Sequence, residues 1–357
     1  MAGPVWESVD DAGMEAASKF AWSGGTGFVA TVLALHGCLG ENTQHMLAWI
    51  PGPIRTPFVI ALIAISTVVH TLPLFVVAFL KWLLPVRAAR DFFAVLLVRL
   101  AESWIAVNAA LVVHFTPTKI HVDGLEGLRN DGHYLVLANH QSWVDITVLQ
   151  TVLNRRMPFL RFFLKSQLIW VPFLGLAWWA LDFPFMKRYS RKQLAKRPEL
   201  AGKDIESTRR ACEKFKGMPV SVMNFVEGTR FTPAKHARQA SPYRHLLKPK
   251  AGGVAFVLDA MGSALHSVVD VAIVYPAGIP TMLDLVSGRI PEVRVRVIER
   301  AIPEELLGIS YENDSAARVR FQRWVNSMWI EKDAVITQLL DSPEVAGATA
   351  TREAASG

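Results

Sequence analysis

A run of 23 residues without a charged side chain, FVIALIAISTVVHTLPLFVVAFL, occupies residues 58–80. A helix needs about 20 consecutive apolar residues to cross a lipid bilayer, so this run predicts a transmembrane helix. His70 and Pro73 interrupt it, which leaves two interpretations open, a single span or a membrane-embedded hairpin. A cleaved signal peptide fits poorly, because the run is too long and lies too far along the chain.

The charges that flank this run predict its orientation. More cationic residues follow the run than precede it: Lys81, Arg87, Arg90 and Arg99 against Lys19 and Arg55. Because cytoplasmic flanks carry the excess of Lys and Arg, the large C-terminal part is predicted to face the cytoplasm. The next apolar segment, residues 92–115, contains Arg99 and Glu102, and we interpret it as an amphipathic juxtamembrane helix rather than a second span.

The composition agrees with a membrane protein that binds anionic ligands. Apolar residues make up 51% of the chain, charged residues 19%, and the net charge is +7. Residues 187–216 alone hold eleven Lys and Arg against four Asp and Glu. This stretch is either a solvated helical face or a surface for anionic lipid or a phosphorylated ligand. No nucleic-acid motif accompanies it, and Cys38 and Cys212 suggest neither a disulfide framework nor a zinc site.

From about residue 119, short apolar strands alternate with helices, as in the strand YLVLANH and the helix DITVLQTVL that follows it. This order predicts an α/β fold with a mixed, mostly parallel sheet covered by helices. The chain is thus divided into a poorly specified N-terminal segment, a membrane anchor, a juxtamembrane helix, an α/β domain, a C-terminal amphipathic helix and a disordered tail. Their predicted boundaries are 1–54, 55–86, 87–118, 119–310, 311–342 and 343–357.

A histidine and a carboxylate stand five residues apart where one predicted strand ends, in the sequence LANHQSWVD. Within one regular helix, this spacing would point His140 and Asp145 in different directions. In a strand–loop–helix arrangement, Asp145 can reach back to the imidazole and leave the other ring nitrogen to accept a proton from a hydroxyl. The alternative is that Asn139 and Asp145 only cap the turn. Ser142 lacks the flanking glycines of a nucleophile elbow, so it is not a candidate nucleophile.

A second strand ends in the polar turn FVEGTRF, residues 225–231. Gly228 allows a ligand to approach the backbone closely, Thr229 can donate a hydrogen bond, and Arg230 suits the geometry of a phosphate. The sequence LKPKAGG places Lys248 and Lys250 before a helix whose N-terminus adds affinity for anions. The alternatives are an ordinary strand-end turn and a solvated loop.

These motifs together resemble the blocks of the lysophosphatidate acyltransferase (PlsC-like) family of glycerolipid acyltransferases, in its bacterial inner-membrane branch. The first block, NHxxxxD, is residues 139–145, and the third, usually Phe-Pro-Glu-Gly-x-Arg, is residues 225–230. The second block is similar to KSQLIWVPFLGLAWWALDFPFMKR, which contains Lys165, Leu168, Pro172, Gly175, Phe185 and Arg188. The fourth, an apolar strand ending in proline, is similar to VAIVYP. The four blocks lie in order within residues 119–300.

The resemblance implies transfer of a fatty acyl group from acyl-CoA or acyl-carrier protein to the free hydroxyl of a lysophospholipid, on the cytoplasmic side of a bacterial inner membrane. His140 would be the general base and Asp145 would orient it, with no acyl-enzyme, cofactor or metal. The implied substrate-binding residues are Glu227, Gly228, Thr229, Arg230, Lys165 and Arg188. Gly228 and Thr229 would stabilise the oxyanion, the cationic residues would bind the phosphate, and Glu227 would fix Arg230 or a glycerol hydroxyl.

Two residues depart from the family pattern: Val226 replaces the usual proline, and Tyr275 stands between the fourth strand and Pro276. Neither is expected to touch His140 or Asp145. Two alternative functions remain open. In one, the same pair activates water in a lipid esterase or thioesterase; in the other, the protein is a catalytically silent lipid-binding membrane protein.

Overall fold

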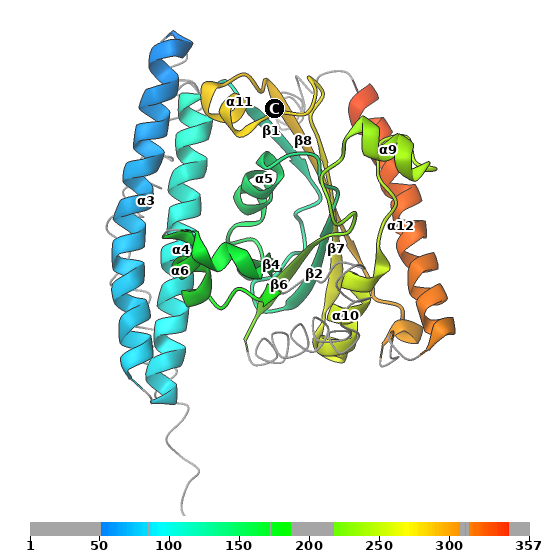
Figure 1. Cartoon of the computed structure of the whole chain (residues 1–357), viewed down its shortest axis with the longest axis horizontal. Coiled ribbons are helices and arrows are strands. Elements are labelled where there is room, and N and C mark those ends of the chain that lie inside the picture. Colours follow the sequence, from blue (N-terminus) through cyan, green and yellow to red (C-terminus); the bar gives the residue numbers. More distant parts are fainter. Residues whose placement is uncertain are drawn as a thin grey trace, which may run out of the picture. The chain divides into compact units, whose positions relative to one another are not determined.

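The computed structural model describes residues 51–84, 86–171, 173–186, 218–307, 311 and 314–342 (Figure 1). It divides into two compact units, Met1–Thr116 and Pro117–Gly357. Most of the predicted N-terminal segment, the basic stretch 187–216 and the C-terminal tail lie outside the described residues.

The first unit contains two long helices, α3 (Gly52–Leu83) and α4 (Arg87–Phe115), which pack against each other. Between them, His70 Nε2 lies 3.2 Å from Ser103 Oγ, and Trp104 Nε1 donates to Thr67 Oγ1 at 3.2 Å. By length and composition alone, both helices are apolar enough to cross a membrane. Because α3 is continuous through Pro73, the possible hairpin inside residues 58–80 is not formed.

The second unit is built on a six-stranded sheet with the order β1-β8-β7-β2-β6-β3. Its strands are β1 (Lys119–Asp123), β2 (His133–Ala138), β3 (Leu160–Phe162), β6 (Val220–Phe225), β7 (Ser267–Val274) and β8 (Glu292–Arg300). Only the β7–β8 pair is antiparallel among the pairings of this sheet in the described residues. The predicted mixed, mostly parallel sheet is therefore confirmed. A separate parallel pair joins β4 (Leu164–Lys165) to β5 (Phe185–Met186).

The α-helices of this unit are α5 (Val144–Leu153), α6 (Leu174–Ala180), α9 (Pro233–Gln239), α10 (Ala251–Met261), α11 (Met282–Ser287) and α12 (Ser315–Asp341). Three short 3-10 helices are η2 (Ser166–Trp170), η4 (Gly262–Ala264) and η5 (Glu304–Leu306). Figure 1 shows α5 on one side of the sheet and α10 with α12 on the other.

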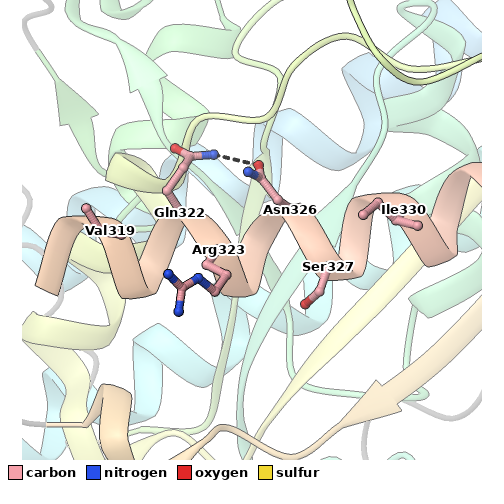
Figure 2. Close-up of a pocket in the computed structure, with 6 residues that line it drawn as sticks. All are labelled: Val319, Gln322, Arg323, Asn326, Ser327 and Ile330. Atoms are coloured by element: carbon pink, nitrogen blue, oxygen red, sulfur yellow. Dashed lines mark hydrogen bonds between the residues drawn. The ribbon is translucent and has the colours of Figure 1, made fainter. Parts of the chain in front are cut away.

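The main core lies between the sheet and the helices α10 and α12. Leu135 and Leu137 of β2 pack there with Val254 of α10 and with Phe321 and Trp329 of α12. Residues 134–138 are fully buried, because a central parallel strand is covered on both faces and therefore reads as a continuous apolar run. A different face of α12, with exposed Val319 and Ile330, lines a shallow hollow of about 460 Å³ that contains none of the predicted site residues (Figure 2).

Candidate active site

The central strands β2 and β6 bring the two polar motifs to one edge of the sheet. These strands are parallel and in register, with Ala138 opposite Phe225, so the chain leaves both strands at the same level. His140 follows two residues after the end of β2, and Glu227 two residues after the end of β6. The backbone N–H of Phe231 donates to the carbonyl of His140 at 2.7 Å, which ties the two loops together.

Asn139 ends β2 by pairing its side chain with the neighbouring strand β7. Its Nδ2 donates to the carbonyl of Ile273 and its Oδ1 accepts from the N–H of Ile273, both at 2.9 Å. The amide is fully buried, so these two bonds replace water at both of its polar atoms. Asn139 therefore does not cap its own turn, as one sequence interpretation had it, but joins the end of β2 to β7.

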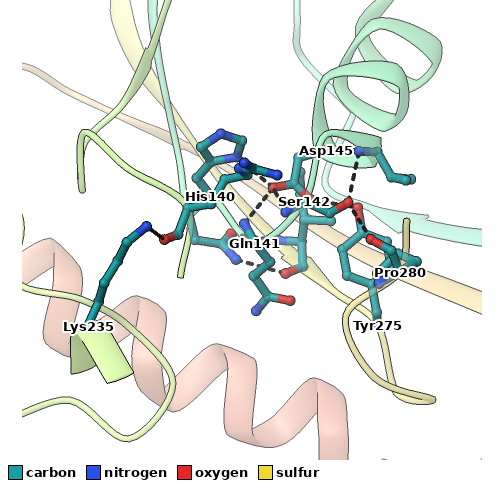
Figure 3. A network of polar contacts seen from close by, with 11 residues as sticks. His140, Gln141, Ser142, Asp145, Lys235, Tyr275 and Pro280 are labelled. Atoms are coloured by element: carbon teal, nitrogen blue, oxygen red, sulfur yellow. Dashed lines mark hydrogen bonds and ion pairs between the residues drawn. The ribbon is translucent and has the colours of Figure 1, made fainter. Parts of the chain in front are cut away.

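His140 and Asp145 form a hydrogen-bonded pair across the strand–loop–helix junction (Figure 3). His140 Nδ1 lies 2.9 Å from Asp145 Oδ2, and the carboxylate is completely buried in the first turn of α5. The same oxygen accepts the backbone N–H groups of Gln141 at 2.6 Å and Ser142 at 2.9 Å. The spacing that would separate the two side chains in a helix thus brings them together here.

The imidazole of His140 is held from a second direction by the ring of Phe225. The two rings are stacked, with centroids 3.8 Å apart and planes 13° apart. The histidine side chain is 13% exposed, so the group can still be reached from outside. Among the described residues Nε2 has no hydrogen-bond partner, whereas Nδ1 is used by Asp145. This geometry is suited to a general base that accepts a proton at Nε2.

Tyr275 is a site residue that the sequence interpretation missed. Its hydroxyl donates to Asp145 Oδ1 at 2.6 Å (Figure 3), so the expectation that this departure from the family pattern does not touch the acid was wrong. Burial raises the pKa of Tyr275 above its usual value, and the adjacent carboxylate raises it further, which keeps the phenol protonated as a donor. The only signal in the sequence was a hydroxyl-bearing residue directly after the apolar run VAIV.

Ser142 has a structural role beside this pair. Its Oγ donates to the carbonyl of Pro280 at 2.6 Å and accepts the N–H of Val144 at 3.1 Å. Both bonds anchor the start of α5, which agrees with the exclusion of Ser142 as a nucleophile.

Glu227 points into the protein, where it is only 1% exposed. Its Oε2 has no hydrogen-bond partner among the described residues. Burial raises the pKa of Glu227 to about 8, although the positive charge of Lys332 acts in the opposite direction. Glu227 is therefore a buried acid that holds its proton more tightly than an exposed one. It does not form the expected pair with Arg230, whose guanidinium instead lies 5.0 Å from the centre of the Trp143 ring.

The turn that follows Glu227 is fixed by a lysine from α9. Gly228 has a φ of 69°, and a Cβ at this position would approach Lys250 Nζ to 3.2 Å. Thr229 Oγ1 accepts from Lys235 Nζ at 2.7 Å, and the same ammonium donates to the carbonyl of Arg230 at 2.8 Å. The sequence interpretation missed Lys235, although its position five residues after Arg230 keeps it within reach. Lys235 contacts only the backbone of Arg230, and the guanidinium of Arg230 lies over the ring of Trp143.

The structure shows no side-chain contact between the other predicted cations and the loops that carry His140 and Glu227. Lys165 is an exposed residue of β4, and no hydrogen bond or ion pair of the described part of the chain joins it to the two loops. Arg188 lies outside the described residues. Lys250 is the N-cap residue of α10, and its backbone N–H donates to the carbonyl of Val226 at 2.9 Å.

Large apolar side chains are exposed on η2 and α6, the elements formed by the second sequence block. The exposed fractions are 85% for Trp170, 69% for Phe173, 49% for Leu176 and 48% for Trp179. Exposed apolar side chains in such number indicate a surface that contacts lipid or protein.

Part of the chain is similar to known proteins. Residues 119–279 match the family model described as Acyltransferase. A 1-acyl-sn-glycerol-3-phosphate acyltransferase gamma of Mus musculus is 26% identical over 214 residues, which cover 57% of this chain and 52% of that protein. A probable 1-acyl-sn-glycerol-3-phosphate acyltransferase 5 of Arabidopsis thaliana is 26% identical over 209 residues, covering 55% and 52%. The chain thus spans about half the length of these curated relatives.

Among solved structures, the 1-acyl-sn-glycerophosphate acyltransferase PlsC of Thermotoga maritima aligns with a TM-score of 0.44 and 17% sequence identity, covering 78% of this chain and 98% of that one. Residues 119–279 are thus similar to the acyltransferase family, and the curated relatives that resemble this part of the chain are 1-acyl-sn-glycerol-3-phosphate acyltransferases.

Proposed function

We propose that this protein is a membrane-bound O-acyltransferase of the 1-acylglycerol-3-phosphate type. It moves a fatty acyl group from acyl-CoA or acyl-carrier protein to the free hydroxyl of a lysophospholipid. The observation that carries the proposal is the imidazole of His140, which is oriented by Asp145 at one ring nitrogen and open at the other. The family match of the surrounding residues supports it.

In the proposed reaction, His140 Nε2 accepts the proton of the substrate hydroxyl while its oxygen attacks the thioester carbonyl. The tetrahedral intermediate collapses, the carbon–sulfur bond breaks, and the proton on the imidazole passes to the leaving thiolate. Asp145 stabilises the imidazolium that exists between these two proton transfers. The substrate supplies the nucleophile, so no acyl-enzyme is required. This agrees with the structural role of Ser142.

The substrate-binding roles follow from charge and position. Arg230 at the exposed end of the Glu227 turn is the first candidate for the acceptor's phosphate, with Lys165 and Arg188 as further cations. The hydroxyl of Thr229 is a candidate donor to the oxyanion of the thioester, whereas the backbone N–H of Gly228 already donates to the carbonyl of Phe225 at 2.9 Å. Glu227 is buried, so it would act from inside the fold.

Attachment to the membrane follows from the lipid substrate and from α3 and α4, each long and apolar enough to cross a bilayer. The cations after residue 80 favour a catalytic domain on the cytoplasmic side, of the inner membrane if the source is bacterial. The exposed tryptophans of η2 and α6 suit the interface of a bilayer.

The test is acyl transfer in detergent micelles, with labelled acyl-CoA and acyl-carrier protein as parallel donors and a panel of lysophospholipids as acceptors. His140→Ala should lower turnover by at least about 100-fold, whereas His266→Ala, which changes a half-exposed histidine on another edge of the fold, should not. Near-normal turnover of His140→Ala would reject the mechanism. Free fatty acid as the sole product would indicate a hydrolase, and lysolipid binding without any product would indicate a silent lipid-binding protein.

A further inference from the structure

The exposed indole of Trp143 lies beside Arg230, the first candidate for binding the phosphate of the acceptor. Trp143 stands between His140 and Asp145 in the sequence and is 55% exposed. The guanidinium carbon of Arg230 lies 5.0 Å from the centre of its ring. Since Trp143 belongs to the loop after β2 and Arg230 to the turn after β6, this contact joins the two loops of the site through side chains.

The indole is carried by a rigid part of the backbone. Trp143 is the N-cap residue of α5, with helical backbone angles of φ −63° and ψ −25°. Its carbonyl accepts the N–H of Ile146 at 3.3 Å. Both neighbouring residues, Ser142 and Val144, are buried, and the hydroxyl of Ser142 is anchored on the carbonyl of Pro280. The position of the indole therefore depends on the same turn that brings Asp145 to the base.

The backbone of Arg230 is fixed as well. Lys235 Nζ donates to the carbonyl of Arg230 at 2.8 Å and to Thr229 Oγ1 at 2.7 Å. The next residue, Phe231, donates its N–H to the carbonyl of His140 at 2.7 Å. Arg230 is thus held at a set place beside the loop of the base, and only its long side chain remains to be ordered.

The contact with Trp143 can order this side chain without using its hydrogen-bond donors. Within the described part of the chain, the guanidinium of Arg230 makes no hydrogen bond or ion pair, and it lies over the aromatic ring. The ring attracts the positive charge, while the five N–H groups of the guanidinium stay free. Two of them can bind a phosphate in parallel. A side chain that is ordered before the ligand arrives loses less conformational freedom on binding.

We propose that Trp143 is a positioning residue for the phosphate of the acceptor. Its indole holds the guanidinium of Arg230 against the loop that carries His140, and so orders the phosphate site beside the base before the lysophospholipid binds. This role rests on the proposed function of the site. It differs from that of the exposed tryptophans on η2 and α6, which suit the bilayer interface, because Trp143 contacts a cation of the site.

The first test compares two ligands that differ in the phosphate, lysophosphatidate and a monoacylglycerol with the same acyl chain. Their binding to the full-length protein is measured in detergent micelles. A cation–π contact at an exposed site is weak, so Trp143→Ala should raise the Kd of lysophosphatidate about two- to fivefold and leave that of monoacylglycerol unchanged. Trp143→Phe keeps an aromatic face and should lie between Trp143→Ala and the wild type.

Two results of this comparison would overturn the proposal. One is an unchanged Kd of lysophosphatidate in Trp143→Ala. The other is an equal loss of affinity for both ligands, which would mean that the indole contacts the acyl chain or the micelle instead of ordering the phosphate site.

A double-mutant cycle shows whether Arg230 carries the effect. In an Arg230→Ala background, Trp143→Ala should cause no further rise in the Kd of lysophosphatidate, because the group that the indole orders is gone. A further rise of the same size would mean that Trp143 binds the lipid independently of Arg230, which contradicts the proposal.

Steady-state kinetics separate an effect on the phosphate from an effect on the base. Trp143→Ala should raise the KM for lysophosphatidate by about the same factor as the Kd, with little change in kcat. A lower kcat at an unchanged KM would mean that the indole supports His140 rather than Arg230, and it would overturn the proposal.

The two proposals fail in different ways. Absence of acyl transfer by the wild-type protein with every donor and acceptor would reject the proposed function, while the binding measurements would still decide the role of Trp143. An active wild type whose Kd and KM for lysophosphatidate equal those of Trp143→Ala would reject the role of Trp143 alone.

Discussion

The hydroxyl of Tyr275 donates to Oδ1 of Asp145 at 2.6 Å, while His140 uses the other oxygen of the same carboxylate. Both oxygens of Asp145 are thus hydrogen-bonded. The loop after β2 contacts Oδ2, and Tyr275, the residue after β7, contacts Oδ1. Since a carboxylate can orient an imidazole only when it is itself fixed, Tyr275 supports the orientation of His140 although it lies 130 residues from Asp145 along the chain.

Removing this hydroxyl should slow the reaction without abolishing it. In Tyr275→Phe the backbone bonds from Gln141 and Ser142 remain, so we expect kcat to fall about tenfold, equal to about 1.4 kcal/mol in the activation barrier, with little change in KM. Steady-state kinetics would measure both constants. Tyr243→Phe is the matched control, because this buried tyrosine lies near Asp333 instead. An unchanged kcat in Tyr275→Phe would show that Asp145 needs no support from β7.

Arg230 should affect binding of the acceptor more than chemistry. Its guanidinium lies over the ring of Trp143 and does not pair with Glu227, so it is available to bind a phosphate. We expect Arg230→Ala to raise the KM for lysophosphatidate about tenfold or more while kcat changes less. Arg238→Ala, which removes an exposed cation from the nearby helix α9, controls for the general loss of charge. Equal effects of the two substitutions would move the phosphate site elsewhere.

The buried Glu227 makes the stability of the fold depend on pH in a defined direction. Its pKa is raised from 4.5 to about 8, so the folded protein keeps a proton that the unfolded chain releases. The contribution of this group to the free energy of unfolding is therefore favourable below about pH 4.5, declines as the pH rises to about 8, and is constant above that value.

Replacing the carboxyl should remove this dependence. We expect Glu227→Gln to gain stability relative to the wild type between pH 5 and pH 8.5, by an amount on the order of a few kcal/mol. Denaturant unfolding across this range would measure the difference. Glu305→Gln, at an exposed position, should show no such trend. A stability difference that is the same at both ends of the range would mean that Glu227 titrates normally in the fold.

The membrane anchor is expected to involve both long helices. The sequence interpretation placed the anchor within residues 55–86, but α4 matches α3 in being long and apolar enough to cross a bilayer. Deletion of residues 1–86 should therefore leave the protein in the membrane fraction, and deletion of residues 1–116 should release most of it. Carbonate-washed membranes would distinguish the two. If the protein without residues 1–116 stayed in the membrane fraction, its attachment to the membrane would be assigned to the exposed tryptophans of η2 and α6.

The local parts of the site could be predicted from the sequence. The apolar run of β2, the loop and the helix α5 lie within about twenty residues, so the contact of Asp145 with His140 was one of the two interpretations that the spacing allowed. The sequence also predicted the strand that precedes the turn of Glu227. The alternation of strands and helices also predicted the mixed sheet, because parallel strands need helical connections between them.

The contacts that the sequence did not predict depend on which strands are neighbours in the sheet. Tyr275 reaches Asp145 and Lys332 reaches Leu137 only because β7 lies beside β2 and α12 covers both. Nothing in the periodicity of a single chain specifies that order. The strands β3, β4 and β5 are only two or three residues long, too short for an alternating pattern. Pro73 was read as a possible break, yet α3 continues through it, as transmembrane helices often do.

The side-chain amide of Asn139 continues the pairing between β2 and β7 where the backbone of β2 has already turned away. One of the two bonds needs the amide nitrogen as a donor. An aspartate at this position would keep the shape, yet it would set an oxygen against the carbonyl of Ile273 in a place that water does not reach. The exchange of one group for another of the same size would thus loosen the strand end beside His140.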